Sequence, residues 1–113
     1  MASVAYRTQV PLSTLTPNIL AGGPLANAPR NGVVTILGTH YDAGAGVLIL
    51  HAYRGTDYAV QGVGIQKTAS GPNRRDNVLA QFGVEQGDAI IVHLQETAGV
   101  ATNPNIVVEF QAV

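Results

Sequence analysis

The chain has 113 residues and no cysteine, and only 12% of its residues are Asp, Glu, Lys or Arg, against roughly 25% in an average soluble domain. A net charge of −1 leaves no basic face for nucleic acid, and the lack of cysteine excludes disulfides and thiolate zinc sites. Because 46% of the residues are hydrophobic, we expect a largely neutral surface that is partly covered by partners.

Residues 1–31 predict an extended N-terminal arm. They hold four of the six prolines and no sustained hydrophobic period. Proline fixes φ and lacks a backbone donor, so this stretch is suited to lie along a surface and poorly suited to the middle of a sheet. Its apolar residues indicate that it docks, either on its own domain or on another molecule. Neither a secretory signal nor a membrane-spanning segment is expected.

From residue 32 onward, short apolar runs alternate with turn signals, a pattern typical of β-strands. Residues 32–40 predict the first strand of this body. Residues 41–46 predict a glycine-bearing hairpin connection into a strand over residues 47–53. A turn at residues 54–57 then leads to the next strand.

That next strand, over residues 58–66, is interrupted by Gly62 and Gly64, which mark a bulge or a close backbone approach. Residues 67–77 are the most polar part of the chain and predict an exposed loop. A strand over residues 78–82 follows.

Two further strands complete the body, after a turn at residues 84–88. Residues 89–96 are largely apolar on both alternating faces, which indicates a central or doubly covered strand. Residues 105–113 alternate, so Ile106, Val108 and Phe110 are expected to enter the core while the other face is partly exposed.

Six body strands over residues 32–113 predict an all-β fold, a small antiparallel β-sandwich. A jelly roll or related Greek-key barrel would close most sheet edges. An immunoglobulin-like sandwich is disfavoured because the chain has no tryptophan.

No motif predicts an enzyme, a cofactor or a metal site. The serines lie outside any Gly-x-Ser-x-Gly elbow, and no cysteine nucleophile exists. The possible nitrogen ligands are His40, His51 and His93, and a site of His40 with Asp42 is conceivable if neighbouring strands complete it. The chain lacks a paired His-x-His, so structural roles for the histidines are favoured.

Two surface features remain as candidate binding sites. Tyr41, Tyr53 and Tyr58 flank turns, which leaves a shallow carbohydrate site as the alternative function. Arg74 and Arg75 suit an interface because guanidinium groups bind carboxylates in a bidentate way, although a solvated loop tip, in which Asp76 partly neutralises them, is the favoured interpretation.

The Pro-containing arm, the compact cysteine-free β body after Asn31, the low charge and the size together resemble the small cement or decoration proteins of tailed-bacteriophage capsids. This resemblance implies a non-enzymatic homo-oligomer, dimer or trimer, that binds the major capsid protein on the outside of the shell and bridges capsomers. It implies assembly in the host cytoplasm, a final location in the virion, and neither nucleic acid nor membrane as a partner.

The arm is the expected partner-binding element under this hypothesis. It would lie on the shell or on a neighbouring copy and add a strand to an exposed edge, while many copies of a modest contact stabilise the shell together. Deletion of residues 1–12 is expected to abolish shell binding and to spare the fold. The candidate partner-binding residues are Val4, Tyr6, Arg7, Val10, Leu12, Arg74 and Arg75.

Overall fold

The computed structural model describes residues 2–41, 46–68, 72 and 77–113. This part of the chain is all-β and contains no helix, which confirms the predicted fold class. The strands are β1 (Ala2–Tyr6), β2 (Gly32–Tyr41), β3 (Leu48–Arg54), β4 (Asp57–Gly64), β5 (Gln66–Lys67), β6 (Val78–Val84), β7 (Ile90–Glu96) and β8 (Asn103–Ala112).

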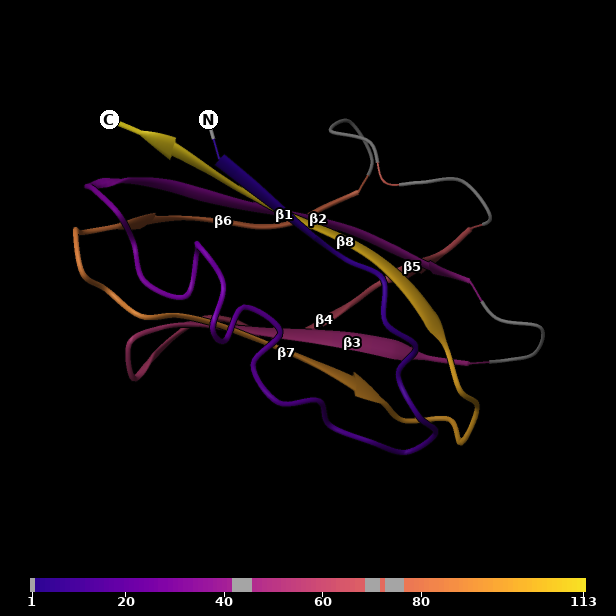
Figure 1. Cartoon of the computed structure of the whole chain (residues 1–113). Helices are drawn as coiled ribbons and strands as arrows, with labels where there is room; N and C mark the ends of the chain where they lie inside the picture. Colours follow the sequence, from indigo (N-terminus) through magenta and orange to yellow (C-terminus); the bar gives the residue numbers. More distant parts are fainter. Residues whose placement is uncertain (1, 42–45, 69–71, 73–76) are drawn as a thin grey trace.

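The strands form two sheets that face each other (Figure 1). The first has the order β1-β8-β2, and β6 and β5 pair with different stretches of β2. The second has the order β4-β3-β7. All pairs are antiparallel except the short parallel pair of β2 with β5.

The hydrophobic core lies between the two sheets. In β8, Ile106, Val108 and Phe110 are buried while the alternate residues are half-buried or exposed, as the period-2 pattern predicts. β7 alternates in the same way, so its predicted apolar second face is only half-buried. The radius of gyration is 13.3 Å, which matches the about 13 Å expected for a compact domain of this length.

The first 31 residues lie along their own chain in this structure. β1 pairs with β8 from Ala2 opposite Phe110 to Tyr6 opposite Ile106, and this strand forms the edge of the first sheet (Figure 1). Four side chains from this region belong to the same core as the rest of the chain: Val10, Leu20, Leu25 and Ala28.

Residues 14–28, called segment 14–28 below, run along the outer edge of β7. The bridges Leu15–Gln95 and Asn27–Ala89 are antiparallel. Backbone bonds join Thr16 N to Leu94 O at 2.8 Å and Ile19 N to Val92 O at 2.9 Å. The edge of β7 is therefore covered by backbone that pairs irregularly and forms no continuous strand.

Side chains replace backbone acceptors where this pairing is irregular. Pro17 has no N–H, and around it the Thr16 hydroxyl accepts from Leu94 N at 2.9 Å. The Asn18 carboxamide oxygen accepts from Val92 N, also at 2.9 Å. Both buried N–H groups of β7 are thus satisfied without a regular strand beside them.

The hairpin predicted over residues 41–46 is wrong. β2 belongs to the first sheet and β3 to the second, so the connection between them passes from one sheet to the other. Glycine-rich turn signals are local and carry no information about which sheet the next strand joins. Residues 42–45 themselves, with Asp42, lie outside the described residues.

The strand predicted over residues 58–66 is divided into β4 and β5. The β3–β4 register shifts twice, and one shift places an extra residue between Val60 and Val63. Gly62, with φ of 72°, lies at this point, which confirms the bulge expected from the glycines.

Candidate functional site

Glu96 organises one end of the molecule. The residue is 1% exposed, and in the described part of the chain its carboxylate accepts from backbone N–H groups of three separate segments. On Oε1 the donors are Ser13 at 3.0 Å, Gly99 at 2.6 Å and Val100 at 2.9 Å, and on Oε2 they are Val47 at 3.2 Å and Ala98 at 2.8 Å.

These hydrogen bonds outweigh the effect of burial on the carboxyl group. Burial alone would raise the pKa of Glu96, but the backbone donors of Ser13, Ala98, Val47 and Val100 lower this pKa to about 2. The group therefore remains a carboxylate at neutral pH. It joins the N-terminal region to the connections that precede β3 and follow β7.

The segments held at Glu96 carry three exposed apolar side chains. Leu12 is 59% exposed, Leu15 55% and Val47 45%. Leu12 precedes Ser13, whose N–H donates to Glu96, and Val47 donates to Glu96 through its own N–H. Leu15 follows Thr14, whose carbonyl accepts from Glu96 N at 3.0 Å. We call these three side chains the Leu12 patch. Each of them is hydrogen-bonded to Glu96 through its own backbone or follows or precedes a residue that is.

The structure separates the candidate partner-binding residues of the arm. Val4 and Tyr6 are half-buried and pack against the core, and Val10 is 0% exposed. Arg7 and Leu12 are exposed. Of these five arm residues, Arg7 and Leu12 are thus the ones exposed to a partner in this conformation, while Arg74 and Arg75 lie outside the described residues.

A second cluster occupies the outer face of the β4-β3-β7 sheet. His51 of β3 lies opposite His93 of β7. The Tyr53 and Tyr58 rings lie 4.3 Å apart between centroids, and His93 meets Tyr53 edge to face at 5.9 Å. Together with Leu15 and Gln95 these side chains line a hollow of about 190 Å³. We call it the Tyr/His patch.

Hydrogen bonds fix both histidine rings of this patch. His93 Nδ1 donates to the Thr16 carbonyl at 2.8 Å, so Nε2 of the neutral ring is an acceptor. His51 Nε2 lies 3.0 Å from the Gln95 carboxamide oxygen, which leaves Nδ1 as its acceptor. A hydrogen bond with Tyr58 raises the pKa of Tyr53, so the Tyr53 phenol stays neutral at physiological pH.

The predicted tyrosine cluster is thereby divided. Tyr53 and Tyr58 stack on each other, whereas Tyr41 lies at the end of β2 in the other sheet. Because these three tyrosines flank neighbouring turns, the sequence predicts that they form one carbohydrate site. Strand register, which local sequence does not reveal, brings His51 and His93 to the two stacked rings instead.

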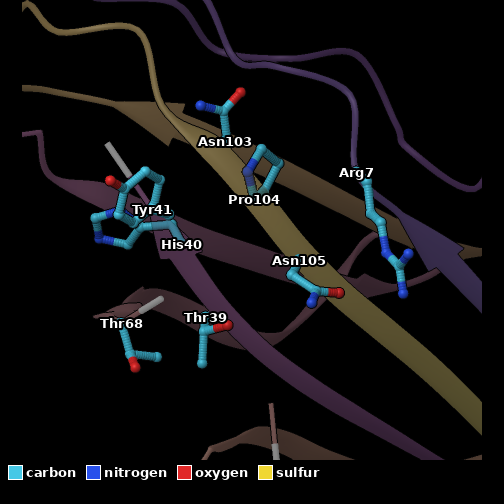
Figure 2. A pocket seen from close by; sticks show the side chains of 8 residues that line it. All are labelled: Arg7, Thr39, His40, Tyr41, Thr68, Asn103, Pro104 and Asn105. Atoms are coloured by element: carbon cyan, nitrogen blue, oxygen red, sulfur yellow. The ribbon is translucent and has the colours of Figure 1, made fainter. Parts of the chain in front are cut away.

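Tyr41 lines a third hollow, of about 360 Å³, at the end of the first sheet. Its walls come from the residue after β1, the end of β2, the residue after β5 and the start of β8, as Figure 2 shows. The lining residues are Arg7, Thr39, His40, Tyr41, Thr68, Asn103, Pro104 and Asn105. We call it the Arg7 pocket.

Within the described residues, no three His, Asp or Glu side chains gather as a metal site. His40 belongs to the first sheet, and His51 and His93 to the second. The described part of the chain also contains no helix of the length and hydropathy needed to cross a membrane.

Comparisons with protein-family models, with curated proteins and with solved structures found no match for this chain. Function is therefore inferred from the residues of this chain alone. Of these, sequence reasoning missed Glu96 and the pairing of His51 with His93, because both depend on contacts between distant segments. The local signal was the strand predicted over residues 89–96, largely apolar on both faces, which contains Glu96 and His93 but gives no indication of His51.

Proposed function

We propose that the fold is a jelly-roll β-sandwich whose N-terminal arm supplies two of its eight positions. Segment 14–28 occupies the place of a second strand beside β7. With this segment numbered two and the minor strand β5 left out, the sheets have the orders 1-8-3-6 and 2-7-4-5, which is the arrangement of an eight-stranded jelly roll. The pairs of β1 with β8, β2 with β6 and β3 with β4 support this assignment.

We propose that the protein is a non-enzymatic capsid decoration protein. It would bind as an oligomer to the outside of a viral shell, on the major capsid protein, and bridge capsomers there. The observation that carries this proposal is the Leu12 patch, three exposed apolar side chains on segments hydrogen-bonded to Glu96. Such a group indicates a protein interface when the surrounding surface carries few charges.

Two further features favour a shell as the partner. Jelly rolls recur among viral structural proteins, although they also occur in lectins. A patch of three side chains gives only a modest contact, and a repeating lattice of identical subunits compensates for weak individual binding through effective concentration. A single soluble partner offers no such compensation.

The test is co-sedimentation with expanded capsids assembled from the major capsid protein encoded in the same genome. We expect the wild-type chain to sediment with the shell and the variant Leu12→Ser/Val47→Ser to remain in solution. Val78→Ser is the matched control, because Val78 and Val47 are both 45% exposed and Val78 lies on β6. Light scattering should give a dimer or trimer for the free protein.

Three results would count against this proposal. They are a genome without a capsid gene, a monomer that leaves shells unbound, and equal loss of binding in the Leu12/Val47 and Val78 variants. The last result would indicate general loss of solubility or fold and would leave the Leu12 patch without a role.

The Tyr/His patch favours carbohydrate binding as a second candidate function. Stacked tyrosines offer an apolar ring face to a sugar, and the fixed histidine acceptors with Gln95 offer partners for hydroxyl groups. A glycan array with the wild-type protein and Tyr58→Ala tests this function. Because Tyr58 is 52% exposed, its replacement by alanine should abolish sugar binding and preserve the fold. A sugar signal that is unchanged in Tyr58→Ala would exclude the Tyr/His patch as the carbohydrate site.

A further inference from the structure

The Arg7 pocket contains a row of polar side chains from three adjacent strands or their ends. Tyr6 pairs with Ile106, so Arg7, one residue later, comes level with Asn105, which in turn pairs with Thr39. Successive side chains of a strand alternate between faces. Arg7, Asn105 and Thr39 therefore share the face opposite to Tyr6 and Ile106, which face the core.

Two members of this row lack a partner for their polar groups. Arg7 has no hydrogen bond or ion pair to any described residue, and no Asp or Glu is among the lining residues. The Asn105 carboxamide oxygen is buried and accepts no hydrogen bond from the described part of the chain. Figure 2 shows this oxygen turned to the side of the pocket on which Arg7 lies.

These groups define what a ligand must supply. A guanidinium fork is best satisfied by a carboxylate, which it binds through two parallel hydrogen bonds. A carboxamide oxygen only accepts, so the same ligand must also carry a donor such as a hydroxyl group. Tyr41, which is 54% exposed and lines the pocket, adds an aromatic surface of the kind that packs against a sugar ring.

We propose that the Arg7 pocket binds a small hydroxylated carboxylate of the acidic monosaccharide class. The carboxylate pairs with Arg7, and a ring hydroxyl donates to Asn105. The volume of about 360 Å³ lies at the lower end of the roughly 300–1,000 Å³ usual for small-molecule sites, which suits one sugar ring. This site is separate from the Leu12 patch and from the Tyr/His patch, and it does not depend on capsid binding.

The experiment is isothermal titration of the full chain with D-glucuronate, D-glucose and acetate. Glucuronate carries both the carboxylate and the hydroxyls, whereas each of the other probes lacks one of them. We expect glucuronate to bind with a Kd in the range of about 1 mM or tighter, and about tenfold more tightly than either of the other probes. No binding of glucuronate, or equal binding of all three, overturns the proposal.

Variants then locate the site. Arg7→Ala should weaken glucuronate binding about tenfold or more, and Arg7→Lys should restore only part of it because the fork is lost. Asn105→Asp should also weaken binding, through repulsion of the carboxylate. Arg30→Ala is the matched control, since Arg30 is exposed and precedes β2 at the strand end opposite Tyr41.

The outcomes are separable from those of the capsid proposal, because the titration uses the isolated protein. Retained affinity in Arg7→Ala, or an equal loss in Arg30→Ala, would show that glucuronate binds elsewhere or only through net charge, and either result would overturn the assignment to this pocket. A thermal unfolding curve of each variant verifies that the fold is intact before titration.

Discussion

Glu96 joins three parts of the chain through one side chain. In the described part of the chain its two carboxylate oxygens accept from five backbone N–H groups, which belong to the N-terminal region and to the residues that precede β3 and follow β7. Connections between strands usually leave such donors to water. At Glu96 a single carboxylate accepts from these N–H groups and so links three segments of the chain.

We predict that Glu96→Gln lowers the unfolding temperature by about 5 °C or more at pH 7, since a buried amide accepts fewer and weaker hydrogen bonds than a carboxylate. The pKa of Glu96 is about 2 in the folded chain against an ordinary 4.5. Its stabilising effect is therefore complete above about pH 4.5 and is lost as the pH falls from there toward 2.

The measurement is thermal unfolding of the wild type and of Glu96→Gln at pH 7 and at pH 3. The difference between the two proteins should shrink on acidification. Glu85→Gln serves as the control, because Glu85 is exposed and its side chain has no comparable set of donors. A gap between wild type and Glu96→Gln that stays the same at both pH values would contradict this account.

At the level of elements, segment 14–28 shows how a proline-containing stretch acts as a sheet edge. Its prolines predicted a segment poorly suited to a sheet, and it forms no regular strand. The Thr16 hydroxyl and the Asn18 carboxamide nevertheless accept from β7 where backbone carbonyls would in a strand. The prolines therefore predicted the irregular backbone of this segment correctly, but they did not predict that it lies beside β7.

We predict that Asn18→Ala loosens this edge and leaves the core in place. The variant leaves Val92 N and Leu20 N without their acceptor, and an unsatisfied buried donor costs about 1–3 kcal/mol. Hydrogen exchange of the Val92 amide should accelerate about tenfold or more, while amides of β8 keep their protection.

The control for this prediction is Asn27→Ala. Asn27 belongs to the same segment but is exposed, and its side chain donates to the Gly87 carbonyl at 3.3 Å. Equal acceleration of Val92 exchange in both variants would mean that the segment is held by its backbone and core contacts alone.

The strands themselves were largely predictable, because turn signals bound short apolar runs and period-2 alternation in β8 reports directly on a buried face. In β7 both faces are apolar in sequence, and only the structure shows which one is buried. The functional surfaces were not predictable. The Tyr/His patch needs the β3–β7 register, and the Arg7 pocket needs the level at which β1 meets β8. Register is a property of pairs of strands, so it could not be predicted from the local pattern of either strand alone.

For the whole molecule, the first 12 residues are part of the folded body. Val10 is fully buried, pairs with Thr102 and joins the core, while β1 lies against β8. The expectation that deletion of residues 1–12 spares the fold conflicts with these contacts. A loss of shell binding in that deletion would not by itself identify the arm as the binding element.

We therefore predict that deletion of residues 1–12 lowers the free energy of unfolding by at least about 2 kcal/mol, since burial of one valine alone contributes about 1.5–3 kcal/mol. Urea unfolding followed by circular dichroism measures the loss. The matched comparison is the full-length Leu12→Ser variant, in which only an exposed side chain changes. An unchanged urea midpoint in the deletion would show that β1 and Val10 contribute little.

The pairing of β1 with β8 has a consequence for biosynthesis. Strand β1 has no partner in its sheet until β8 exists, because among the described strands β1 pairs with β8 alone. During translation β1 must therefore remain unpaired, with both of its edges open, until β8 has left the ribosome. Contacts this distant in sequence slow folding, so the nascent chain is exposed to aggregation until β8 becomes available.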